Sequence, residues 1–134
     1  MSTLSAEQAT ELGDQFSKMG DEIRDYYLGN FDALSHEERD TMSKQMMEMW
    51  SMSSSMYTLS AVLVLDDLET SLQQIRGIEA EIGTTLKNLA NVQKAIDITG
   101  AAVALAAALL SKDPKAIGTS MEGLAGKIAD AKTA

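Results

Sequence analysis

The sequence predicts an all-α fold, an antiparallel four-helix or five-helix bundle with one long central helix, formed by a single domain over residues 1–134. Apolar residues recur every three or four positions through about half of the chain, which is the spacing of helices that bury one face. The chain has a single proline, which lies near its end. A chain of this length buries about two thirds of its unfolded surface, so it needs no disulfide or metal to fold.

The first helix is expected over residues 6–28. Ser5 and Gln8 have the spacing of a capping box, in which a serine hydroxyl accepts from a free amide N–H of the first turn. Gly29-Asn30 should end the helix, because both residues tolerate the left-handed conformation that closes helices. The predicted buried stripe consists of Leu12, Phe16, Met19, Ile23 and Tyr27.

The long central helix is expected over residues 36–82, at a length of roughly 70 Å. Ser35 and Glu38 form a second capping box at its start. Its weak point is the serine-rich segment 51–55, because serine side chains compete for backbone hydrogen bonds and favour a kink or a break, which would divide residues 36–82 into two helices. The apolar spacing nevertheless keeps its phase across this segment, and residues 61–65 are interpreted as a buried helical turn.

Glycines mark the weak positions of the predicted helices. Gly13 and Gly20 should each weaken the first helix by about 1 kcal/mol relative to alanine. Gly83 is the predicted break after the long helix, so a third helix is expected over residues 84–111.

The last helix is expected over residues 114–131. Asp113-Pro114 predicts its start, because aspartate is a preferred N-cap and proline a preferred first helical residue. Its apolar face consists of Ile117, Met121, Leu124 and Ile128.

Composition excludes several classes of function. The chain has no cysteine, so it holds neither a disulfide nor a thiolate metal site. The net charge is −9, which disfavours binding to nucleic acid. Sixteen acidic and five basic residues precede Gly83, whereas four acidic and six basic residues follow Thr84. No secretory signal pattern begins the chain, so the cytoplasm is the default expectation for its location.

No residues form a recognisable catalytic, cofactor or metal motif, and the chain is predicted to be non-enzymatic. The single histidine, His36, lies one helical turn before Asp40, which by itself is a weak metal signal and is interpreted as an exposed first-turn residue. Paired acids such as Asp66 with Glu69, and Glu79 with Glu81, are interpreted as a solvated face.

A cluster of methionines around the only tryptophan is the candidate functional site. Methionine is common on surfaces that adapt to partners, and tryptophan often anchors interfaces. The sequence therefore predicts a protein–protein interaction module that self-assembles or binds a larger protein; packing of the same residues in the core is the other interpretation. The predicted interface consists of Met42, Met46, Met49, Trp50, Met52 and Met56.

The alternative function is a small membrane-active protein that forms or regulates a pore. It is based on the alanine-rich segment 98–110, in which Gly100, Ala104 and Ala108 recur every four residues. Small residues at this spacing let two helices approach closely, in membranes or in soluble bundles.

Overall fold

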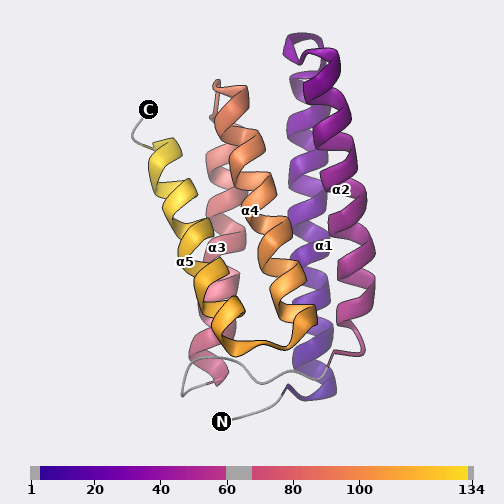
Figure 1. Cartoon of the computed structure of the whole chain (residues 1–134), viewed down its shortest axis with the longest axis vertical. Coiled ribbons are helices and arrows are strands. Elements are labelled where there is room, and N and C mark those ends of the chain that lie inside the picture. Colours follow the sequence, from indigo (N-terminus) through magenta and orange to yellow (C-terminus); the bar gives the residue numbers. More distant parts are fainter. Residues whose placement is uncertain (1–3, 60–67, 133–134) are drawn as a thin grey trace.

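The computed structural model describes residues 4–59 and 68–132. Five α-helices and one short 3-10 helix account for most of this part of the chain, in which no strand occurs. The helices lie side by side, and successive helices run in opposite directions (Figure 1). The elements are α1 (Ala6–Gly29), η1 (Phe31–Ala33), α2 (His36–Met56), α3 (Leu68–Lys87), α4 (Val92–Ser111) and α5 (Pro114–Lys132).

The N-terminal ends of α1 and α2 follow the sequence prediction. The hydroxyl groups of Ser5 and Ser35 accept from the amide groups of Gln8 and Glu38, and both reciprocal side-chain bonds are present. The first four residues of the predicted stripe of α1 are buried, but Tyr26 rather than Tyr27 completes it.

The end of α1 does not use a left-handed residue. Asn30 has a φ angle of −117°, and its backbone N–H and its side-chain amide both donate to the carbonyl of Tyr26. The asparagine side chain therefore satisfies the helix end, and the predicted left-handed closure is wrong.

The prediction of one long helix over residues 36–82 is wrong. Helix α2 ends at Met56, directly after the serine-rich segment, and α3 runs in the opposite direction (Figure 1). The hydroxyls of Ser54 and Ser55 donate to the carbonyls of Trp50 and Ser51, so the serines bind the backbone of their own helix. The predicted buried turn over residues 61–65 lies outside the described residues.

The predicted break at Gly83 is also wrong, because α3 continues through this residue to Lys87. The break comes over residues 88–91, and the side chain of Asn91 accepts from the Lys94 amide and caps α4. In contrast, α5 starts as predicted at Pro114, and the carboxylate of Asp113 accepts from the Lys115 amide.

The packing leaves α3 less covered than the other helices. Helix α1 packs against α2 and α3, and α4 packs against α2 and α5. The contact of α3 with α5 is small, and its main neighbour is α1. The core lies along these contacts, with Phe16, Met49, Ile82 and Leu105 among its fully buried side chains.

Candidate functional site

Most of the predicted methionine interface lies in the interior of the molecule. Helix α2 packs on α1 and α4, and four of its methionines are buried along these two contacts. They fill the core, so they do not offer a free surface to a partner. These four residues are Met42, Met46, Met49 and Met56.

The other two predicted interface residues, Trp50 and Met52, are half-buried against the core. The indole of Trp50 lies over Gly20 of α1, and its Nε1 donates to Asp21 Oδ1 at 3.3 Å. The methionine that is free on α2 is Met47, which is 66% exposed and was not in the predicted set. Its position, out of phase with the other methionines, is the sequence signal for this exposure.

A second close approach between α1 and α2 lies next to Gly13. The ring of Tyr57 packs on this glycine, and the tyrosine hydroxyl donates to Asp14 Oδ1 at 2.8 Å. The hydroxyl of Ser53 donates to the Gly13 carbonyl at 2.9 Å. Gly20 therefore makes room for Trp50 of α2, and Gly13 for Tyr57 directly after α2, a role that the sequence did not reveal.

The small residues predicted to form one face of α4 differ in their exposure. Gly100 is half-buried beside Gln45 of α2, Ala104 is exposed, and Ala108 is buried. An exposed stripe instead follows the spacing four, three, four along the helix. It consists of Gly100, Ala104, Ala107 and Ser111, with Gly100 the least exposed of the four.

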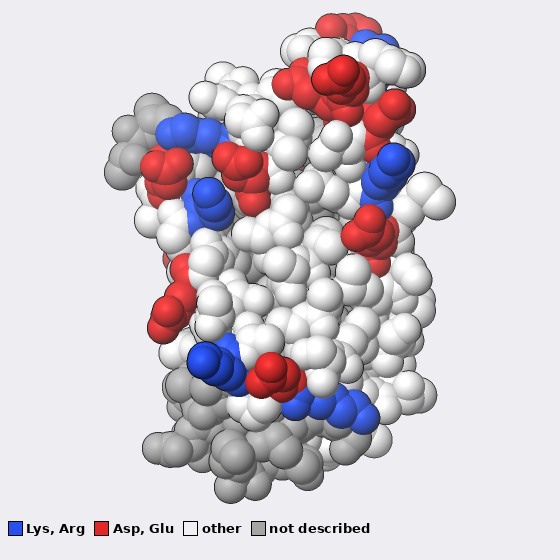
Figure 2. All heavy atoms as spheres, viewed as in Figure 1, with Lys and Arg blue, Asp and Glu red and all other residues white. Residues whose placement is uncertain are grey.

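This stripe of α4 belongs to a face without charge. Residues 98–111 of α4 and 49–56 of α2 contain no acidic or basic side chain. Figure 2 shows a broad uncharged surface over the middle of this side of the molecule, with charged side chains gathered toward its ends and edges. We call this surface, formed by the exposed and half-buried residues within 98–111 and 49–56, the uncharged face.

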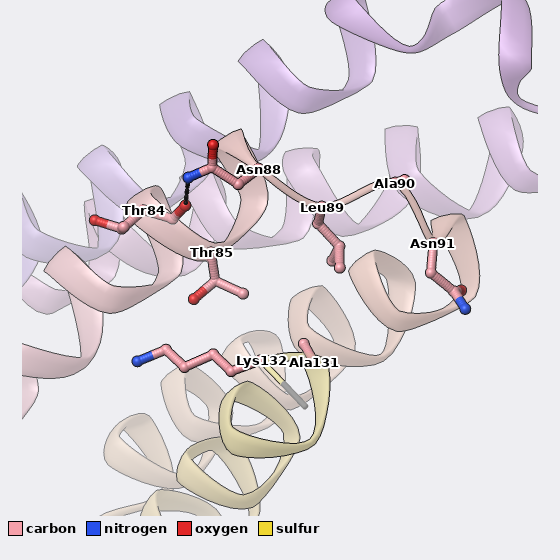
Figure 3. Close-up of a pocket in the computed structure, with 8 residues that line it drawn as sticks. All are labelled: Thr84, Thr85, Asn88, Leu89, Ala90, Asn91, Ala131 and Lys132. Atoms are coloured by element: carbon pink, nitrogen blue, oxygen red, sulfur yellow. Dashed lines mark hydrogen bonds between the residues drawn. The ribbon is translucent and has the colours of Figure 1, made fainter. Parts of the chain in front are cut away.

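Several cavities lie along α3 in the described part of the chain. One of about 540 Å³ lies where the end of α3, the start of α4 and the end of α5 meet (Figure 3). There Thr85 is buried, and its hydroxyl has no hydrogen-bond partner among the described residues. A second cavity of about 540 Å³ lies between α1 and α3, and a third of about 390 Å³ lies between α3 and α5.

The cavity between α1 and α3 contains a carboxyl group that the sequence did not single out. Both carboxyl oxygens of Glu22 are buried, and no N–H or hydroxyl of a described residue donates to them. The carboxyl lies against Gly83 and within hydrogen-bonding reach of the Glu79 carboxyl. Glu79 itself is 5% exposed and 3.4 Å from Lys18 Nζ, so its interpretation as part of a solvated face is wrong.

The surroundings of Glu22 favour its protonated form. Its pKa is raised from an ordinary value of 4.5 to about 8, first by burial and then by the hydrogen bond and the charge of Glu79. Lys18 opposes the shift, and Asp25 contributes to it. The protonated form of Glu22 explains how the two carboxyls lie together away from solvent, because two adjacent carboxylates would repel each other.

The other titratable candidates have a simpler environment. The His36 imidazole lies 3.6 Å from the Asp40 carboxylate, and both side chains are mainly exposed, as predicted. Within residues 4–59 and 68–132, no group of three histidine or acidic side chains is placed to hold a metal ion. Asp66 lies outside the described residues, as does the side chain of Glu69.

Comparison with protein families, curated proteins and solved structures gives no match to this chain.

Proposed function

We propose that this chain is a non-enzymatic interaction protein, folded as a helical bundle, and that it binds a second copy of itself through the uncharged face. The observation that carries the proposal is the exposed stripe of small residues on α4, which lies in the middle of that face. This proposal moves the interface from the core methionines of α2 to the outer side of α4.

Charge favours this face over the rest of the surface. Each copy has a net charge of −9, so two copies repel each other through most of their acidic surface. The uncharged face adds no like-charge contact when two copies meet there. A partner of the same sequence is therefore best accommodated at α4.

The spacing of the stripe suits a helix from the second copy. Gly100, Ala104 and Ala107 follow each other at the four-three spacing of a coiled-coil seam. Their small side chains allow two helix backbones to approach closely, so that the flanking half-buried Val103 and Leu110 also come into contact. A two-fold axis near Ala104 would pair this surface with itself.

Light scattering on a sizing column tests the proposal over a range of protein concentrations. The wild-type chain should form a dimer, and Ala104→Glu should be a monomer because the carboxylate would be buried at the centre of the contact. Ala129→Glu is the matched control, since Ala129 is exposed on α5, away from residues 98–111, and this variant should still dimerise. A wild-type monomer at every concentration would overturn the proposal.

The membrane-active function is the second candidate, and α4 again provides the observation that favours it. Among the described helices, α4 is the one that is long and apolar enough to cross a bilayer, and half of it is buried here. This burial is also what a core helix of a soluble protein shows. Flotation with neutral liposomes separates the two: a bound fraction that Ala104→Glu abolishes would favour the membrane.

A further inference from the structure

The carboxyl pair between α1 and α3 has a consequence for how firmly α3 is held. We propose that Glu22 and Glu79 form a proton-operated latch: a proton shared by the two carboxyls holds α3 against α1, and rising pH loosens α3. The proposal is independent of the dimer, because it concerns the opposite pair of helices.

The position of the pair makes α3 sensitive to it. Glu22 projects from α1 between Glu79 and Gly83, which lie one turn apart on α3. The absence of a side chain at Gly83 leaves the space that the carboxyl occupies. Since α1 is the main neighbour of α3, a repulsion at this point acts on the principal contact that keeps α3 in place.

The remaining charged groups near Glu22 do not compensate for the loss of the proton. Among the described residues, Lys18 and Asp25 of α1 and Glu79 and Lys87 of α3 surround it. Lys18 is the cation paired with Glu79, and its own side chain is largely exposed to solvent. Lys87 is likewise exposed, so when Glu22 ionises, two adjacent carboxylates face each other while both lysines remain largely solvated.

The direction of the pH effect follows from the raised pKa. With α3 released, Glu22 would ionise near its ordinary value of 4.5, whereas with α3 docked it keeps its proton up to about pH 8. The docked state therefore binds more protons between these values, and its advantage is lost progressively as pH rises through this window. Above about pH 8 both states are ionised, and the loss is complete.

Release of α3 would uncover apolar side chains on two helices. Ile75, Ile82 and Leu86 are buried on α3, and Ile23 is buried on α1. The cavities on both sides of α3 mean that fewer side chains must separate when it moves. The opening therefore separates α3 from its neighbours and does not unfold the whole molecule.

Hydrogen exchange followed by mass spectrometry, corrected for the intrinsic exchange rate at each pH, tests the latch in the full chain. Protection of amides in residues 72–87 should fall by up to about tenfold for each pH unit between about pH 5 and about pH 8. Protection of α2 and α4 should change much less. Glu22→Gln retains a side chain that can donate to Glu79 but does not titrate, so protection of α3 should become independent of pH.

Glu81→Gln is the matched control, because Glu81 is an exposed residue of the same helix, 3.1 Å from Lys132 Nζ. It should keep the wild-type slope. If Glu22→Gln does not fold, Glu79→Gln replaces it; Glu22 still titrates in that variant, but without the charge of Glu79 the fall in α3 protection with pH should become shallower than in the wild type. The latch is overturned if wild-type protection of α3 does not change with pH, if the variant keeps the wild-type slope, or if α2 and α4 lose protection as strongly as α3.

Discussion

At the scale of single residues, Gly20 shows how the backbone of α1 makes room for a side chain of α2. A Cβ on Gly20 would lie 2.5 Å from Nε1 of Trp50, which is closer than real atoms approach. Gly20→Ala should therefore displace the indole from Asp21 and lower the free energy of unfolding by about 1–3 kcal/mol, despite the better helix propensity of alanine. Urea denaturation followed by circular dichroism measures the change.

Gly77 provides the control for this substitution, because nothing lies within 4 Å of a Cβ at that position. Gly77→Ala should stabilise the chain by about 0.5–1 kcal/mol through helix propensity alone. If both variants shift stability in the same direction, steric contact with Trp50 does not determine the effect of alanine at position 20.

The same residue scale marks the limit of what sequence predicts. Local features were predicted correctly, because both capping boxes and the start of α5 at Asp113-Pro114 depend on residues three or fewer positions apart. Glu79 and Gly83 were misread because their environment is set by Glu22, more than 50 positions earlier in the chain. Pairwise spacing along one helix carries no information about a partner on another helix.

At the scale of the element, α2 has a buried and an exposed methionine only two residues apart. Met49 is fully buried, so Met49→Ala should cost about 2–5 kcal/mol by leaving a cavity in the core. Met47→Ala should change stability by less than about 0.5 kcal/mol, because its side chain is in solvent. Thermal unfolding of both variants measures this; equal losses would mean that Met47 also contacts something in solution.

The start of α4 is fixed by Asn91, and this element boundary is also testable. Asn91→Ala removes the acceptor for the Lys94 amide and should cost about 1 kcal/mol. Asn91→Ser retains an acceptor and should lose only a fraction of this. Equal losses in the two variants, measured by chemical denaturation, would show that the cap contributes little and that packing alone defines the start of α4.

The spacing of apolar residues predicts the helical fold, but it does not predict the lengths of the helices. The stripe stays in phase from residue 42 to residue 63, which predicted a single helix, and yet α2 ends at Met56. The phase of an apolar stripe shows which residues face inward, but it does not show where the chain turns back. The candidate interface changed for the same reason, because the methionines face α1 and α4 rather than a partner.

At the scale of the whole molecule, the net charge of −9 and the uncharged face act in opposite directions on self-association. Two copies that meet at α4 bring the acidic parts of their surfaces close together, so these parts repel each other. This repulsion weakens as added salt shortens the Debye length from about 30 Å at 0.01 M to about 8 Å at 0.15 M. Added salt should therefore strengthen the dimer, measured as a lower dissociation constant by sedimentation.

A substitution far from α4 sharpens this last prediction. Lys127 is exposed on α5, so Lys127→Glu makes each copy more acidic without touching residues 98–111. It should raise the dissociation constant at low salt and steepen its dependence on salt, while leaving the dimer almost unchanged at high salt. If salt instead weakens the wild-type dimer, the contact joins the acidic first part of one copy to the basic last part of another. The interface would then lie outside the uncharged face.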